Sequence, residues 1–145
     1  MEETKEVARL NGYVLTISGR RRYLNDIRSS DNFKRSQAER QAINTVIQGS
    51  AADLMKAAMI QLSERLQSWQ EVAVGEDSIS PRPRMVLQIH DEVLLELRFN
   101  EGDIKRLQAI ALKSCCHDCE ELFNLKVPLL IKCSCGLSFG SMKEI

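Results

Sequence analysis

The longest regular pattern in this sequence is a helical repeat of apolar residues between residues 34 and 69. Apolar side chains recur there every three or four positions, which is the spacing of one face of an α-helix. Gly49 interrupts the repeat, and a glycine inside a helix costs about 1 kcal/mol relative to alanine. We therefore expect two helices that meet near Gln48 and Gly49, with one long helix as the alternative. The repeat consists of Ile43, Ile47, Ala51, Leu54, Ala58, Leu62 and Leu66.

The patterns on either side of this repeat predict an α+β fold in which helices back a small antiparallel sheet. After residue 84 the apolar period changes from that of a helix to two, the period of a strand. At 145 residues the chain has the size of one ordinary domain. The expected elements are a helix over 2–10 that ends at Asn11 and Gly12, a strand over 13–17, a loop over 24–33, a flexible connection over 70–84, an antiparallel hairpin of strands 85–89 and 93–97, a helix over 101–124 and a last strand over 127–135.

Composition limits the class of protein and its compartment. No apolar run approaches the ~20 residues that span a bilayer, and the charged residues 1–5 are unlike a signal peptide. We therefore expect an intracellular protein without membrane association. The five cysteines indicate reduced thiols in such a compartment. The spacing of Cys116, Cys119, Cys133 and Cys135 would suit a zinc site, but we favour their use as small core residues.

Polar residues occupy the expected bend of the hairpin, where His90, Asp91 and Glu92 separate the two strands. Two adjacent carboxylates repel each other unless they face water or a cation. Magnesium is usually held by one or two protein carboxylates together with substrate phosphates. We therefore take Asp91 as a magnesium ligand, with Glu92 as a second candidate. The alternative is a solvated polar turn, and the spacing alone does not separate the two.

A second polar group lies on the long helical segment, where Arg40, Asn44 and Gln48 are four residues apart and so form a stripe. Their donors and acceptors suit the minor groove of a duplex, whose acceptor positions all base pairs share. Small residues follow directly and permit a close backbone approach. The alternative is an ordinary solvated helix face.

Residues 20–40 contain seven basic and three acidic side chains, although the whole chain has a net charge of zero. This strip begins with Arg20, Arg21 and Arg22. The guanidinium fork binds phosphate through two hydrogen bonds, and its charge releases counterions from a duplex. We take these three arginines as candidate phosphate contacts, with a solvated turn as the alternative.

Three segments, GYVLTISGRRRYL, AERQAINTVIQGSAADLMKAAM and QIHDEVLLEL, resemble the family A DNA polymerases in this order and over nearly the whole chain. Their residues are most similar to the theta and nu branch of that family. The resemblance implies a palm-type antiparallel hairpin and strand backed by long helices. It places residues 1–145 in the C-terminal palm, with about 1–35 at the end of the fingers. It also implies DNA replication or repair and, for this branch, a nuclear location.

The resemblance also implies roles for single residues. Asp91 matches the palm aspartate that binds the two catalytic magnesium ions, with Glu92 beside it, and His90 matches a histidine near the primer terminus. Primer-template DNA and deoxynucleoside triphosphates are then the partners. The matching DNA-binding set consists of Arg40, Asn44 and Gln48 at the minor groove, Arg20, Arg21 and Arg22 near the template, and Gln88 beside the HDE turn.

The chain also departs from the family pattern. The other metal-binding aspartate and the nucleotide-binding helix of the family belong to earlier motifs, which this chain does not contain. We therefore expect a fragment that is inactive in isolation, since one carboxylate pair does not position two ions. The final CSCGLSFGSMKEI resembles the closing strand and tail of the family. Two alternatives are a non-catalytic nucleic-acid-binding fragment and a zinc-binding interaction module.

Overall fold

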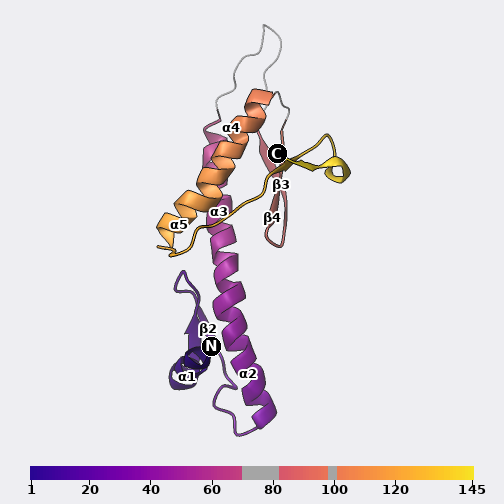
Figure 1. Ribbon diagram of the computed structural model, residues 1–145. Helices are drawn as coiled ribbons and strands as arrows, with labels where there is room; N and C mark the ends of the chain where they lie inside the picture. The colour runs from indigo at the N-terminus through magenta and orange to yellow at the C-terminus, as the bar shows by residue number, and fades with distance from the viewer. Residues whose placement is uncertain (70–81, 98–100) are drawn as a thin grey trace. The chain divides into compact units, whose positions relative to one another are not determined.

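The computed structural model describes residues 1–69, 82–97 and 101–145. It divides into two units, Met1–Lys56 and Ala57–Ile145, each of which is considered by itself. The predicted connection over 70–84 falls mainly outside the described residues. None of the helices in the described parts of the chain is long and apolar enough to cross a membrane. The elements are helices and short antiparallel strand pairs (Figure 1), so the predicted α+β class is confirmed.

The first unit begins with helix α1 (Glu2–Asn11), which ends where predicted. Gly12 adopts a φ of 77°, and its N–H donates to the carbonyl oxygen of Ala8 over 2.8 Å, because a residue without Cβ takes this left-handed conformation without strain. Strand β1 (Tyr13–Leu15) then pairs antiparallel with β2 (Arg21–Tyr23). Strand β2 was not predicted. All three of its residues are exposed, so no apolar alternation marks it in the sequence.

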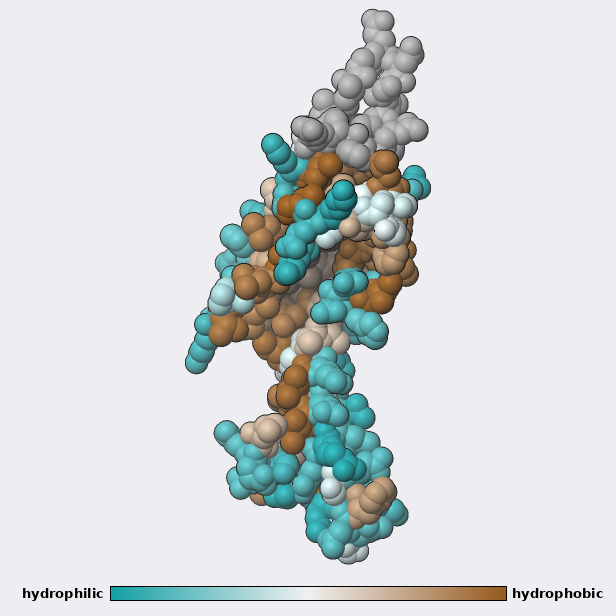
Figure 2. All heavy atoms as spheres, turned by 45° about the vertical axis from the view of Figure 1, so that its right-hand side comes forward, coloured by the Kyte–Doolittle hydropathy of each residue, from teal (hydrophilic) through white to brown (hydrophobic). Residues whose placement is uncertain are grey.

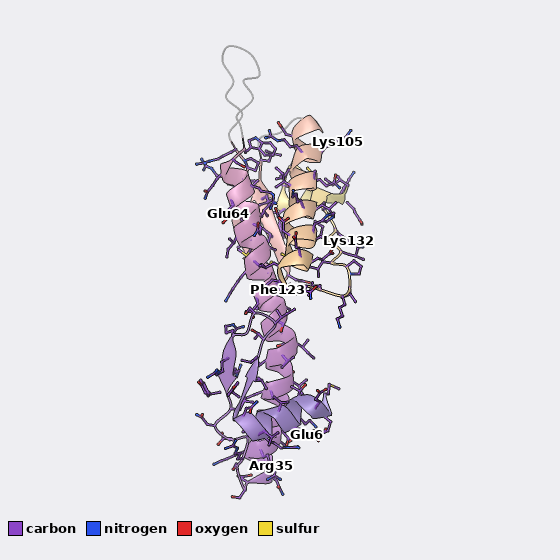
Figure 3. The ribbon with its side chains drawn as sticks, turned by 90° about the vertical axis from the view of Figure 1, so that its left-hand side faces the viewer. Glu6, Arg35, Glu64, Lys105, Phe123 and Lys132 are labelled. Carbon is purple, nitrogen blue, oxygen red and sulfur yellow. The ribbon has the colours of Figure 1, made fainter. Side chains whose placement is uncertain are left out.

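Helix α2 (Asn32–Asn44) completes the core of this unit. Asp31 caps its start, since the Asp31 carboxylate accepts from the backbone N–H of Phe33 over 2.8 Å. In Figure 3, α1 with the labelled Glu6 lies across α2 with the labelled Arg35. An ion pair of 2.6 Å between Arg9 and Glu39 joins these two helices. The buried core consists of Ala8, Val14, Leu24, Ile27, Ala38 and Ala42, with Val46 packed against it.

The expected break in the long helical segment lies at the right place but has a different form. Helix α2 passes into a π-helical turn, η1 (Thr45–Gly49), which passes directly into α3 (Ser50–Gln67). The ribbon stays helical throughout (Figure 1), so two separate helices are not formed. Thr45 Oγ1 also donates to the carbonyl oxygen of Gln41 over 2.7 Å, a contact that often bends helices. Gly49 and Thr45 therefore change the pitch of the helix without ending it.

In the second unit the predicted hairpin is confirmed. Strand β3 (Arg84–Ile89) pairs antiparallel with β4 (Glu92–Glu96), with a bulge between Met85 and Leu87. One face of this hairpin packs against the end of α3 and against α4 (Glu101–Leu112), as Figure 1 shows. Its buried centre is Leu62, Leu66 and Trp69, surrounded by Met85, Val93, Leu95, Leu97, Leu107, Ile110 and Cys115.

The predicted helix over 101–124 is formed as far as Leu122, with a π-helical turn inside it. The predicted strand over 127–135 is largely wrong. Helix α4 is followed by a π-helical turn, η2 (Lys113–His117), and by α5 (Asp118–Leu122). In the described residues only β5 (Ser134–Cys135) of the predicted last strand is formed, and it pairs with β6 (Lys143–Glu144). A single-turn 3-10 helix, η3 (Phe139–Ser141), lies between them. Apolar alternation over 127–133 does not by itself make a strand, because each strand needs a hydrogen-bonded partner.

Large apolar side chains are exposed on the second unit. The face in Figure 2 shows brown, hydrophobic residues gathered over this unit, whereas the first unit is mainly hydrophilic there. Leu130 and Leu137 are each 90% exposed. Leu87 and Ile89 of the hairpin are also exposed.

Candidate metal and nucleic-acid site

The hairpin tip is a two-residue turn, because Ile89 pairs directly with Glu92. His90 and Asp91 form this turn, and His90 has a φ of 53°, a conformation that costs an ordinary residue on the order of 1 kcal/mol. The side-chain amide of Gln88 donates to the carbonyl oxygen of His90, which braces the turn. Glu92 is thus the first residue of β4 rather than part of the bend. Gln88, predicted to contact DNA, has one of its amide hydrogens directed to the turn itself.

The carboxylates of Asp91 and Glu92 are both exposed. Glu92 lies opposite Ile89 and on the same face as Glu96, since successive strand residues alternate between faces. Within residues 1–69, 82–97 and 101–145, no three histidine, cysteine or acidic residues form a cluster suited to a metal ion. The tip therefore offers one or two hard oxygen ligands. That number fits magnesium, which takes its remaining ligands from water and phosphates.

The predicted stripe is present on the first unit. Arg40, Asn44 and Gln48 are all exposed, and the buried Ala38 and Ala42 occupy the opposite side of the helix. Arg40 and Asn44 are each two positions along the chain from a buried alanine. Two positions correspond to a rotation of about 200° around the helix axis. Because the alanines must face the core formed with α1 and β1, the sequence directs the stripe to solvent.

The π-helical turn changes how this stripe is aligned. Eight residues of uninterrupted α-helix would rotate Gln48 about 80° from Arg40. A π-helical turn bonds each residue to the fifth along the chain instead of the fourth, so each residue within it adds less rotation. Gln48 lies inside η1, and the wider turn brings it back toward the line of Arg40 and Asn44.

Arg20 does not extend freely into solvent. Its Nε donates to Asp53 Oδ1 over 3.0 Å, and its Nη2 donates to the carbonyl oxygen of Gly49 over 3.2 Å. Asp53 is only 8% exposed. Burial alone raises the pKa of Asp53, but hydrogen bonds from Ser18, Thr16 and Arg20 and the charge of Arg20 lower it to about 2. Asp53 is therefore an ionised, paired carboxylate at neutral pH.

The other two arginines of the triplet differ from each other. The guanidinium of Arg21 lies 4.3 Å from the ring centre of Tyr13, and its Nη1 donates to the Tyr23 hydroxyl over 3.1 Å. This hydrogen bond is the main cause that raises the pKa of Arg21. Arg22 is exposed on β2. The structure thus brings all three into one hairpin but engages Arg20 and Arg21 within the chain.

Two of the five cysteines lie in the core, and the other three are partly buried. No metal-binding cluster includes them among the described residues, so the zinc-site alternative is not supported. Cys116 and Cys119 are buried, and Cys119 Sγ donates to the carbonyl oxygen of Ser114 over 3.3 Å. Burial raises the pKa of Cys115 to about 11. None of the five cysteines, all of which lie in the described residues, forms a disulfide bond.

Asp53 and Ser18 are the polar residues that the sequence analysis missed. Ser18 Oγ donates to Asp53 Oδ2 over 2.6 Å, across 35 residues of sequence. An aspartate four positions after Gly49, on a face otherwise formed by small residues, is the only local signal of this contact.

Comparison with known proteins agrees with these features. Residues 1–141 match the family model described as DNA polymerase family A. The chain is 36% identical over 140 residues to DNA polymerase theta of Drosophila melanogaster, covering 95% of this chain and 6% of that protein. It is 38% identical over 143 residues to DNA polymerase I of Caldicellulosiruptor bescii, covering 99% of this chain and 15% of that protein. The relatives thus include theta, the branch expected, and DNA polymerase I.

A solved structure has a similar fold. The polymerase domain of Pol1 from M. smegmatis, in complex with DNA primer-template and dNTP, matches with a TM-score of 0.70 and 36% identity. The match covers 89% of this chain and 20% of that chain. The chain spans 6% and 15% of the two relatives above. With a family match from residue 1 to residue 141, this chain belongs to DNA polymerase family A.

Proposed function

We propose that this chain contributes to a DNA-directed DNA polymerase, in which a primer 3′-hydroxyl loses its proton and attacks the α-phosphate of a deoxynucleoside triphosphate, and pyrophosphate leaves as the bond between the α- and β-phosphates breaks. The observation that supports this most is the family match over residues 1–141 combined with an exposed carboxylate pair at a braced hairpin turn. Because the chain spans a small part of its relatives, the activity is proposed for the complete protein. Residues 1–35 would then belong to the end of the fingers and the remainder to the palm.

Asp91 and Glu92 would hold magnesium through their carboxylate oxygens. Bound magnesium ions stabilise the attacking and leaving oxygens of a phosphoryl transfer. The turn itself is held by the bond from Gln88 to the His90 carbonyl, so Asp91 starts from a defined backbone position, and His90 lies beside it. Preorganisation of this kind lowers the cost of ordering the site during reaction.

Arg40, Asn44 and Gln48 would hydrogen-bond the minor groove of the primer-template duplex. Their exposure on the side of α2 and η1 opposite the buried alanines supports this. Minor-groove acceptors are common to A·T and G·C pairs, so contacts there suit an enzyme that must hold every sequence. Arg22, which is exposed in β2, would contact a phosphate of the template.

The test is primer extension by the complete polymerase carrying Asp91→Asn. We expect the single-turnover rate to fall at least about a hundredfold, because loss of a metal ligand removes several kcal/mol of transition-state stabilisation. Binding of primer-template DNA should change little. The control is Glu96→Gln, which removes a carboxylate from the same hairpin at the end opposite the turn and should extend at the normal rate. Normal extension by Asp91→Asn with intact DNA binding would favour the non-catalytic nucleic-acid-binding alternative instead.

A further inference from the structure

The loop between β1 and β2 is fastened to the helix by a cluster of contacts around Asp53. Ser18 Oγ donates to Asp53 Oδ2 over 2.6 Å, and Arg20 Nε donates to Asp53 Oδ1 over 3.0 Å. Asp53 is 8% exposed, whereas the donors Ser18 and Arg20 are exposed, so both bonds are partly shielded from water. A charge-assisted bond of this kind is stronger than a neutral one. Both oxygens of a buried carboxylate are thus used to hold one loop.

The residues directly after Gln48 complete this attachment. Ser50 Oγ accepts from the backbone N–H of Ile17 over 2.9 Å, and the Gly49 carbonyl oxygen accepts from Arg20 Nη2 over 3.2 Å. A Cβ at Gly49 would lie 2.9 Å from Thr16 Cγ2, closer than such atoms normally approach. The close approach predicted for these small residues is therefore made by the chain's own loop.

The geometry points to Asp53 as a positioning residue that keeps η1 in its π-helical form through Arg20, and so sets the direction of Gln48. Arg20 Nη2 donates to the carbonyl oxygen of Gly49, the last residue of η1, while Nε of the same planar guanidinium donates to Asp53. If the turn relaxed into regular α-helix, one residue of register would be lost, and the parts of the helix on either side would rotate by about 100° relative to each other. Gln48 would then lie about 80° from Arg40 around the helix axis instead of close to the line of Arg40 and Asn44.

This role differs from the phosphate contact predicted for Arg20. The donors Nε and Nη2 are directed at Asp53 and Gly49, and the negative charge of Asp53 offsets that of the guanidinium. An arginine in this arrangement orients a turn through two bonds from one planar group. A lysine, with a single ammonium group, does not reproduce both bonds.

The inference rests on the proposed contact of Gln48 with a duplex, and a double-mutant cycle in the complete polymerase tests it. The variants are Asp53→Asn, Gln48→Ala and the combination, and the assay is the anisotropy of a fluorescein-labelled primer-template duplex. We expect each single substitution to weaken binding about threefold to tenfold, the range of one lost hydrogen bond. The combined variant should bind the duplex as tightly as Gln48→Ala alone, because Asp53 is proposed to act only through Gln48.

Further variants separate positioning from general damage and from direct DNA contact. Glu39→Gln removes another paired carboxylate of the same unit, whose partner is Arg9, and should leave the affinity unchanged. Arg20→Lys should weaken binding as much as Asp53→Asn, whereas a phosphate contact would tolerate lysine. Asp53→Asn could lower the melting temperature so far that the unit unfolds at the assay temperature. In that case Ser18→Ala takes the place of Asp53→Asn in the cycle, because Ser18 is exposed and its substitution removes only one hydrogen bond to Asp53.

The outcomes distinguish the inference from the function on which it rests. Two results would overturn the positioning role and leave the duplex contact intact. One is a combined variant whose loss of duplex affinity is the product of the two single losses, and the other is an Asp53→Asn variant that binds the duplex as tightly as the unsubstituted protein. Unchanged affinity of Gln48→Ala would reject the duplex contact and, with it, the positioning role.

Discussion

Acid sensitivity of the first unit is a direct consequence of the Asp53 contacts. The ordinary pKa of this carboxyl is 3.8, and in the folded chain it is lowered to about 2. A group whose pKa is lower in the folded state stabilises the fold above its unfolded pKa, and this stability is lost as the pH falls through the folded pKa. A difference of nearly two units corresponds to about 2 kcal/mol at pH 7, about half of that at pH 3 and little at pH 2.

The perturbation that isolates this contribution is Asp53→Asn, because the amide keeps the shape of the side chain and removes its titration. Urea unfolding of both proteins, followed by circular dichroism, gives the difference in free energy of unfolding at each pH. We expect this difference to shrink by about 2 kcal/mol between pH 7 and pH 2. Asp26→Asn, at an exposed aspartate of the same unit, corrects for the general effect of removing a negative charge. A difference that stays constant over this range would refute the assignment of Asp53 as a paired, ionised carboxylate.

Three further predictions concern packing and thiol chemistry. Gly49→Ala should destabilise the chain in urea unfolding by about 1–2 kcal/mol, since overpacking against Thr16 outweighs the better helix propensity of alanine, whereas Gly140→Ala, which meets nothing within 4 Å, should have little effect. Leu62→Ala should cost about 2–5 kcal/mol, measured as a lower urea midpoint, because Leu62 is only 2% exposed. Cys115, with its pKa raised to about 11 from 9.0, should react with iodoacetamide at pH 8 about a hundredfold more slowly than an ordinary thiol, as mass spectrometry of the modified peptide would measure.

Elements with a strong apolar period could be predicted from the sequence. The β3–β4 hairpin has apolar alternation on both strands, and its pairing follows because only a short turn separates them. The C-terminal end of α1 could also be predicted, since Gly12 takes a conformation that most other residues avoid. The positions of Arg40 and Asn44 on one exposed face followed from the helical repeat alone.

Features that depend on distant contacts could not be predicted in this way. Strand β2 is exposed and rich in arginine, and it exists because Tyr13 and Tyr23 pair across the turn. Asp53 looks like an ordinary helix aspartate until residues 16–20 fold onto it. The alternation over residues 127–133 predicted a strand, but alternation records only which side chains are apolar and not whether a partner strand is available.

Both π-helical turns share a physical feature that the local sequence does not show. In η1 the contact comes from Arg20, which donates to the Gly49 carbonyl oxygen, and in η2 it comes from Arg65, whose Nη1 donates to Ser114 Oγ over 3.2 Å. Ser114 is fully buried, so this bond satisfies a hydroxyl that water does not reach. A π-helical turn has poorer intrinsic stability than α-helix, and in both places an arginine from another segment contacts it. Both irregular turns are therefore contacted by a tertiary hydrogen bond that helix propensity does not supply.

The QGSAAD segment, residues 48–53, has two sides with different contacts. As a sequence, it combines one polar residue with small ones and suggests a surface open to a duplex. In the folded unit the segment has two sides, because Gln48 is exposed while Gly49, Ser50 and Asp53 bind the chain's own loop. The bonds of these residues within the chain give them a role that does not require contact with DNA. Their substitution should therefore affect DNA binding only through the direction of Gln48, and this dependence separates an indirect role from a direct contact.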